Sequence, residues 1–342
     1  MKTVNFKDTR IEYLDVLRGI AIILMIMGHI GFGYIFDKYI HVFHMPIWFF
    51  ISGWFFKVKE NEKIGKLIIK YAKSLLVPYV IWGILQYPIW LLLCRTPEDD
   101  IWEPLRNLFW MNTNLIMPIA GALWFLTCLF FAQVFFSILL RKIKNTLIII
   151  MIVVFISTCG CYWNRFASFR LPWALDTAFV ALGFVALGYY LHQEMKRKIV
   201  QKAFNLTLPI CVIAFSINGI LGLLNGYVNM RVGTYGIVTV FWFNAIIAIL
   251  VYWNGSRLLY QYMEVRKHKG LNWIQEIGKN SIVYLCLNQL VILVLSKILV
   301  ALGFSDIPLG IRGVILLFIT LPILYKIEKI FINSCAKILF GK

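Results

Sequence analysis

Long apolar segments constrain this chain more than any other feature of its sequence. A helix needs about 20 mainly apolar residues to cross a membrane, and segments of roughly that length follow one another along the whole chain. We expect membrane-spanning helices at residues 13–35, 40–56, 74–94, 117–140, 146–163, 174–192, 205–224, 235–255, 280–301 and 310–332. The sequence therefore predicts an all-α polytopic membrane protein with about ten transmembrane helices.

Composition supports the same class of protein. Charged residues make up 15% of the 342 residues, whereas a soluble domain carries about 25%. The net charge of +18 would indicate nucleic acid in a soluble protein, but here the basic residues lie between apolar segments, so we expect no nucleic-acid partner. The seven cysteines show neither a disulfide framework nor metal-ligand spacing, so no metal site is expected. The first apolar segment lacks a small-residue cleavage site and is expected to remain as an anchor.

The basic residues also predict orientation, because lysine and arginine concentrate in cytoplasmic loops. With the N-terminus in the cytoplasm, most of the 34 lysines and arginines fall in inner segments, and both termini are expected to be cytoplasmic. The outer segments then carry only Lys38, Arg95, Arg106, Arg165, Arg170, Arg231 and Arg312. We expect the longest outer loop, residues 95–116, to be solvated, although a lid over an outward cavity is an alternative.

The first apolar segment carries Asp15, Arg18 and His29 at membrane depth, where an Arg or Asp costs about 2.5–3.5 kcal/mol and usually has a function. Arg18 and His29 are eleven residues apart, which places them within about 20° of one helix face and roughly 16 Å apart along the axis. Asp15 can pair with Arg18 at i, i+3 spacing. This face predicts a functional site that combines an anion-binding cation with a proton-transferring group.

Structural alternatives exist for both residues. Arg18 can mark the cytoplasmic end of the helix, with its head group reaching the interface. His29 can be a neutral histidine that forms a hydrogen bond with a neighbouring helix.

The next segments add further candidates near that face. His44 begins the second span on the outer side, and two nearby histidines suit proton transfer from a hydroxyl; an interfacial histidine without a role is the alternative. Ser52 and Gly53 are better explained by close helix packing. Lys70 and Lys73 continue a basic stripe at the cytoplasmic mouth, which either contacts anionic lipid heads or binds a nucleotide phosphate.

Later spans carry three more candidates. Trp124 is first an aromatic-belt residue at the outer interface. Asp176 lies near the outer end of its span, where it can orient a histidine or bind sugar hydroxyls. Asn288 lies in the middle of the ninth span and is expected to face the interior of the bundle.

These stretches together resemble the integral-membrane acyltransferase family 3, the bacterial O-acyltransferases of surface polysaccharides, and most closely its fucose 4-O-acetylase-like branch. The resemblance is carried, in family order, by YLDVLRGIAIILMIMGH, FHMPIWFFISGWFF, the basic stripe ending in LLVPY, GALWFL and IGKNSIVYLCLNQLVI. It implies a single integral-membrane acyltransferase domain over residues 1–342 in the bacterial cytoplasmic (inner) membrane. The chain ends at Lys342, so the periplasmic esterase-like domain of longer relatives is expected to be absent.

The resemblance also implies an activity. Such an enzyme takes an acyl group, usually acetyl, from cytoplasmic acyl-CoA and passes it to a sugar hydroxyl of a lipid-linked or cell-surface glycan. His29 matches the family's essential histidine and Arg18 its partner toward the CoA side. Lys70 and Lys73 stand where the family has an Arg-x-x-Arg pair, and Asn288 stands where many relatives have histidine.

We therefore expect Arg18, Lys70 and Lys73 to bind the phosphates of acetyl-CoA and His29 to act as general base. An acyl-histidine relay is the mechanistic alternative. Acceptor or support roles are expected for Asp15, His44, Ser52, Trp124, Asp176 and Asn288. A transporter or flippase of lipid-linked sugars is the alternative function, although no internal repeat is visible.

Overall fold

The computed structural model describes residues 12–57, 62–113, 118–266, 272–304, 307–332 and 339–341. The long helices are α1 (Glu12–Ile30), α5 (Val77–Leu93), α7 (Trp124–Lys142), α8 (Thr146–Phe166), α9 (Leu175–Gln193), α11 (Leu208–Leu224), α12 (Val238–Arg266), α14 (Ser281–Ala301) and α15 (Leu309–Ile332). The short helices are α2 (Tyr34–His41), α3 (His44–Trp54), α4 (Ile64–Tyr71), α6 (Glu103–Phe109), α10 (Lys198–Ala203) and α13 (Asn272–Lys279). The remaining described helical segments are one short π-helix, η1 (Ala72–Leu76), and four short 3₁₀ helices: η2 (Pro118–Leu123), η3 (Pro172–Ala174), η4 (Glu194–Lys196) and η5 (Met230–Val232).

The predicted fold class is confirmed. Within the described residues, 7 helices are long and apolar enough to cross a membrane. They are Glu12–Ile30, Ile64–Leu93, Ala120–Lys142, Thr146–Phe166, Pro172–Lys196, Val238–Val265 and Ser281–Ala301. The protein is therefore an all-α polytopic membrane protein. The count of ten spans and the cytoplasmic orientation stay predictions, and both chain ends lie outside the described residues.

Three predicted segments differ from the observed helices. The first helix ends at Ile30 rather than near residue 35, because Gly31 and Gly33 follow with φ angles of 80° and 107°, a conformation that glycine adopts without steric cost. The expected span at 40–56 is divided between α2 and α3. Between the expected spans at 235–255 and 280–301, α12 continues to Arg266 and the short helix α13 packs against α1.

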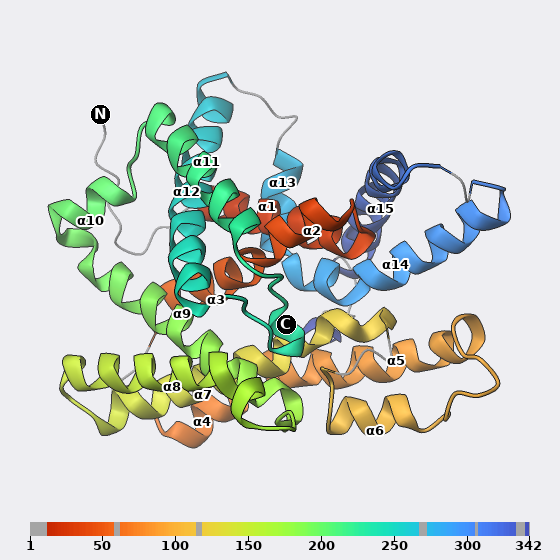
Figure 1. The fold of residues 1–342 in the computed structure, drawn as a ribbon, viewed down its shortest axis with the longest axis horizontal. Coiled ribbons are helices and arrows are strands. Elements are labelled where there is room, and N and C mark those ends of the chain that lie inside the picture. Colours follow the sequence, from red (N-terminus) through yellow and green to blue (C-terminus); the bar gives the residue numbers. More distant parts are fainter. Residues whose placement is uncertain are drawn as a thin grey trace.

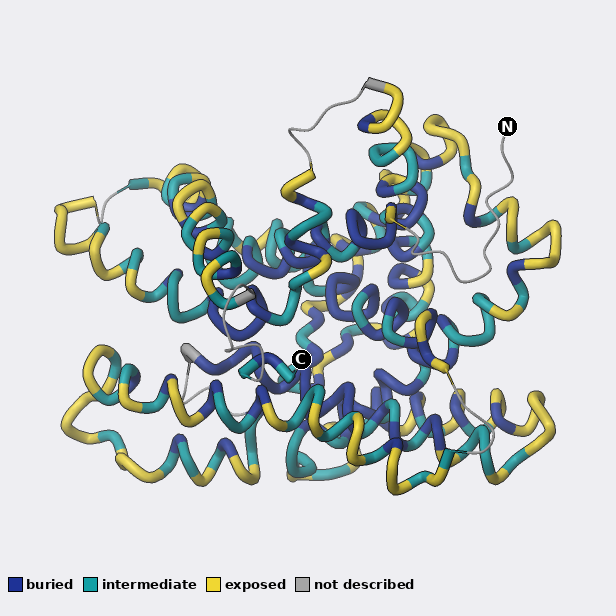
Figure 2. The backbone as a smooth tube through the Cα atoms, turned by 180° about the vertical axis from the view of Figure 1, so that it is seen from behind, coloured by how far each residue is buried: buried dark blue, intermediate teal, exposed yellow. Residues whose placement is uncertain are grey.

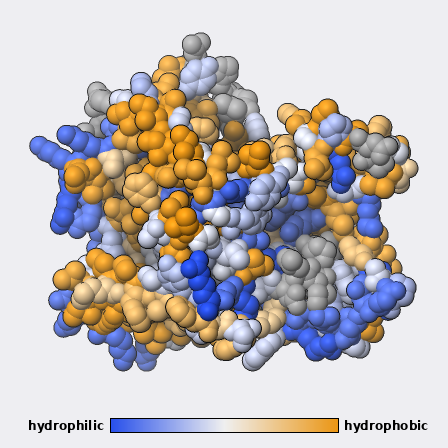
Figure 3. Space-filling model, viewed as in Figure 1, coloured by the Kyte–Doolittle hydropathy of each residue, from blue (hydrophilic) through white to orange (hydrophobic). Residues whose placement is uncertain are grey.

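Helices α1 and α3 lie in the middle of the molecule, with α7 and α8 along one side and α11 and α12 along another (Figure 1). Buried backbone is concentrated in this middle region (Figure 2). Gly53 allows the close approach that its residue type predicted, since a Cβ atom there would lie 2.0 Å from the carbonyl oxygen of Val185 on α9. Figure 3 shows hydrophobic residues over much of one face, with hydrophilic residues near its centre, at its left edge and at its lower right. The core that positions α1 is therefore packed within a lipid-compatible exterior.

Candidate active site

Two cavities lie along α1 within the described residues. The first, called the inner cavity after the orientation predicted from the sequence, has a volume of about 210 Å³ and is lined by Arg18 together with residues of α3, α7 and α14. The outer cavity, about 130 Å³, is lined by His29 and by residues of α2, α3, α14 and the η5 turn. The two polar residues predicted to share one helix face therefore line two separate spaces, one at each end of that face.

The two cavities have walls in common. Met25, Met45 and Leu285 line both of them, so the two cavities adjoin one another at these side chains. Methionine is unbranched and adapts its shape to its surroundings. The arrangement places the cation and the histidine on two adjoining cavities along α1.

Local contacts fix the Arg18 end. Arg18 donates from Nη1 to Oδ1 of Asp15 over 3.2 Å, the i, i+3 pair that the spacing predicted. Its guanidinium lies 4.6 Å from the ring centre of Phe55, within range of a cation–π interaction. Ser52 lines the same cavity, and its hydroxyl donates to the Trp48 carbonyl over 2.9 Å. A cation held in this way is suited to an anionic group that enters the inner cavity.

Lys70 and Lys73 do not line either cavity. Both side chains are exposed, Lys70 at the end of α4 and Lys73 in η1. The η1 turn is a π-helix, a rare local form that often lies at functional sites, and within it Leu75 reaches the inner cavity. The structure thus separates the two lysines from Arg18, although the turn that carries Lys73 contributes to the same cavity wall.

The hydrogen bonds of Asn288 determine how His29 is presented. The Asn288 amide donates to the Tyr284 and Leu285 carbonyls, each over 2.8 Å, and its Oδ1 lies 2.5 Å from Nδ1 of His29. Because the amide nitrogen is already engaged, Oδ1 is the acceptor and His29 donates from Nδ1. The Nε2 atom of a neutral His29 then keeps its lone pair, the state that a general base or a nucleophile requires.

Two residues predicted from the sequence share the outer cavity with His29, and so does one histidine that was not predicted. His44 and Trp124 line it, and so does His41, which the sequence reasoning missed although it precedes His44 by three residues. The rings of His41 and His44 are 5.1 Å apart, and Nδ1 of His44 donates to the Ile40 carbonyl over 2.9 Å. Trp124 is only 6% exposed, so it is a cavity residue and the expectation of an aromatic-belt position is wrong.

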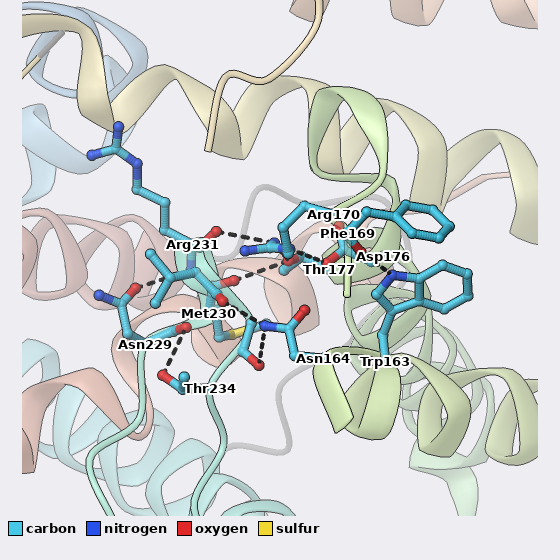
Figure 4. A network of polar contacts seen from close by, with 12 residues as sticks. Trp163, Asn164, Phe169, Arg170, Asp176, Thr177, Asn229, Met230, Arg231 and Thr234 are labelled. Carbon is cyan, nitrogen blue, oxygen red and sulfur yellow. Dashed lines mark hydrogen bonds and ion pairs between the residues drawn. The ribbon is translucent and has the colours of Figure 1, made fainter. Parts of the chain in front are cut away.

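Asp176 lies outside both cavities. It is buried and accepts a hydrogen bond from Nε of Arg170. Arg170 also donates from Nη2 to the Arg231 carbonyl over 3.1 Å, and the Thr177 hydroxyl donates to the Met230 carbonyl over 2.9 Å. Figure 4 shows this network beside the η5 turn. Asp176 therefore supports a loop of the outer cavity instead of contacting a histidine.

Arg231 is the second cavity residue that the sequence reasoning missed. It lines the outer cavity, and its side chain points away from the Arg170–Asp176 network in Figure 4. The sequence offered no signal for this position, because Arg231 was one of several basic residues in predicted outer segments.

Among the described residues, no group of three or more His, Cys, Asp or Glu side chains is arranged to hold a metal ion. The six cysteines of this part of the chain are free thiols.

The chain belongs to acyltransferase family 3. A family model described as an acyltransferase domain matches residues 11–327, which include both cavities and all the candidate residues above. Comparison with curated proteins and with solved structures gives no significant match. The protein is thus an acyltransferase of a membrane-embedded family, and the predicted family is confirmed.

Proposed function

We propose that this protein is an O-acyltransferase that moves an acetyl group from acetyl-CoA on the cytoplasmic side to a sugar hydroxyl of a cell-surface or lipid-linked glycan. The observation that carries the proposal is the pair of cavities that share Met25, Met45 and Leu285. They place a cation suited to CoA phosphates and a histidine whose Nε2 is available on adjoining cavities. Family membership supports acyl transfer in general and does not favour a flippase.

Arg18 and His29 have different roles in this proposal. Arg18 binds a phosphate of CoA at the mouth of the inner cavity, and the pantetheine arm extends along α1 toward His29. The distance expected between the two positions, roughly 16 Å on a helix, is suited to an extended arm. Lys70 and Lys73, being exposed, attract the anionic donor from a distance. The small outer cavity, about 130 Å³, favours a short acyl group such as acetyl.

The chemical step needs one base. Nε2 of His29 accepts the proton of the acceptor hydroxyl, and the oxygen attacks the thioester carbonyl carbon. The carbon–sulfur bond breaks, and the departing thiolate takes the proton from the imidazolium. Asn288 holds the ring through Nδ1 and stabilises the protonated state. The products are an O-acetyl ester and free CoA.

Turnover of acetyl-CoA by the purified full-length protein in liposomes tests this proposal. Wild type should release CoA, slowly without a glycan and faster with a membrane extract that supplies acceptor. His29→Ala should lower the rate about a hundredfold or more, since general bases contribute 10²–10⁴-fold. His192→Gln is the matched control, because His192 lies outside both cavities and binds the Trp54 carbonyl. Equal turnover by His29→Ala and wild type, or no turnover with any acceptor extract, would contradict the proposal.

A further inference from the structure

A groove that the proposed reaction does not use lies between α2 and α11, two helices that contact each other (Figure 1). It is lined by residues 32–36, Tyr39, Phe215, Gly219 and Leu223 and has a volume of about 690 Å³; we call it the α2–α11 groove. Five of its nine lining residues are Phe or Tyr, and none of the nine is charged. Because such a lining favours apolar groups, the groove is suited to a hydrocarbon chain.

The groove opens to the outside of the bundle and keeps its shape. Tyr34, Ile35 and Phe215 are exposed, as expected of side chains that face lipid. Tyr39 is fixed by its hydroxyl, which donates to Oδ1 of Asn218 over 2.8 Å, and its ring lies 6.2 Å from that of Phe215. At Gly219 a Cβ atom would meet no other atom within 4 Å. The groove is therefore a preorganised space rather than a gap that its own side chains fill.

Helix α2 connects this groove with the outer cavity. Its last residue, His41, lines the outer cavity. The His41 ring lies 5.5 Å from the ring of Tyr227, which stacks at 6.0 Å on Tyr34 in the groove. A row of three rings thus leads from the cavity of His29 to the apolar groove. A ligand with a polar part and a hydrocarbon part can occupy both spaces at once.

Lys38 places a positive charge at the rim of the groove. Its Nζ donates to the carbonyl of Leu223 over 2.7 Å, and an ammonium group has three donors, so two further N–H groups are available to a ligand. The neighbouring carboxylate of Asp37 is directed to the turn after α1, where its Oδ1 accepts from the Phe32 amide over 3.4 Å. A lysine at the edge of an apolar groove is suited to a lipid that carries a phosphate.

We infer that the α2–α11 groove binds the hydrocarbon chain of a lipid-linked acceptor, with the phosphate of the lipid at Lys38 and the sugar in the outer cavity. The word acceptor rests on the proposed function, whereas binding of a lipid phosphate does not. Continuity with the outer cavity favours this occupant over a membrane phospholipid, because a lipid-linked sugar fills both spaces. The acceptor is thus a sugar that is still attached to its lipid carrier.

Binding is tested first, by native mass spectrometry of the full-length protein in detergent without acetyl-CoA. Farnesyl phosphate is the probe, and farnesol and phosphatidylglycerol are its comparisons. We expect one farnesyl phosphate to bind, with farnesol roughly tenfold weaker because it lacks the charged hydrogen bond. Lys38→Gln should remove this difference by weakening farnesyl phosphate alone.

Gly219→Leu fills the groove and should weaken the binding of both farnesyl compounds roughly tenfold or more, since displaced methylene groups lose their apolar contacts. Leucine favours a helix more than glycine does, so this variant is expected to fold. Gly255→Leu is the matched control, because Gly255 is an exposed glycine of α12 with open space around it and lines neither the groove nor the two cavities.

Three results of this experiment would overturn the inference. Farnesyl phosphate may bind Gly219→Leu and wild type equally, which would place the lipid elsewhere. Phosphatidylglycerol competing equally with farnesyl phosphate would assign the groove to ordinary membrane lipid. A dimer that Gly219→Leu dissociates would assign it to a second copy of the chain.

Product analysis then tests the link with the acceptor. The full-length protein is given radiolabelled acetyl-CoA and a membrane extract, and the label is separated into lipid-linked and water-soluble products. Wild type should label the lipid-linked fraction. Gly219→Leu should need roughly tenfold more extract to reach half of its maximal rate, whereas Gly255→Leu should behave as wild type.

Label that enters only water-soluble glycan would overturn the inference and leave the proposed function intact. If no acetyl group is transferred to any product, the proposed function fails, while the mass spectrometry still decides whether the groove binds a lipid phosphate.

Discussion

The two cavities along α1 are built in different ways. At the inner end, the ion pair of Asp15 with Arg18 is formed by residues three positions apart on one helix. At the outer end, His29 forms a hydrogen bond with Asn288 from α14. It shares its cavity with His41 from α2, His44 from α3 and Arg231 from η5. A cation held by a neighbour on its own helix binds anions with little selectivity, whereas a site assembled from several helices selects its ligand by shape. The comparison suggests that the inner end recognises a donor with a common phosphate group and that the outer end sets specificity and chemistry.

The shared wall provides the strongest test of the comparison. Met25→Trp should place a bulky ring between the cavities and lower acetyl transfer about a hundredfold, the usual result of displacing reacting groups. Acetyl-CoA binding at the Arg18 end, measured by titration calorimetry, should persist and show that the variant is folded. Met27→Trp is the control, since Met27 is on the same helix but lines neither cavity. Normal transfer by Met25→Trp would show that the two cavities do not work as one path.

Removal of the His29 support should have the next largest effect. Asn288→Leu keeps a branched side chain with four heavy atoms at this buried position but removes the acceptor for Nδ1. An unsatisfied donor costs about 1–3 kcal/mol, so we expect kcat to fall roughly thirtyfold with little change in KM for acetyl-CoA. Asn288→Asp retains an oxygen acceptor and should lose less activity. A rise in donor KM without a change in kcat would assign Asn288 to binding.

Substitution of Arg18 should affect the donor alone. Arg18→Gln removes the cation but retains a polar side chain, and it should raise KM for acetyl-CoA about tenfold, as expected for one charge-assisted hydrogen bond. The turnover number at saturating donor should change little. Initial rates over a range of donor concentrations measure both values. A lower kcat with unchanged KM would instead connect Arg18 with the chemical step.

The smallest effect is expected for the exposed lysines. The double variant Lys70→Gln, Lys73→Gln should raise donor KM only about twofold at low salt, and the difference should disappear at high salt because exposed charges are screened. Rates at two ionic strengths are sufficient to measure this. A salt-independent rise in donor KM of tenfold or more would show that the two lysines bind CoA directly, as the family resemblance implied.

Sequence patterns identified much of the inner end and only part of the outer end. Helical periodicity is enough to pair Asp15 with Arg18 and to place His29 on the same face, since these relations depend only on the geometry of one helix. The family motifs also marked Asn288 and Trp124. They did not indicate that Asn288 orients His29, because that contact joins residues of α1 and α14.

Asp176 and Arg231 show most clearly what the sequence patterns could not predict. Asp176 was expected to contact a histidine or a sugar, yet the fold brings Arg170 to it and uses the pair to hold η5. Arg231 carried no pattern of its own, since a lone arginine in a short polar segment is indistinguishable from any solvated charge.

The sequence by itself determined the class of protein, the membrane location of the helices and the polar face of α1, because hydrophobicity and helical period act over neighbouring residues. Only the tertiary structure decided which distant side chains share a cavity with His29 and which nitrogen of that histidine is available. It also decided that Lys70 and Lys73 line neither cavity. These outcomes depend on contacts between helices far apart in the chain. Packing and hydrogen-bond satisfaction across the whole bundle select such contacts, and no local pattern encodes them.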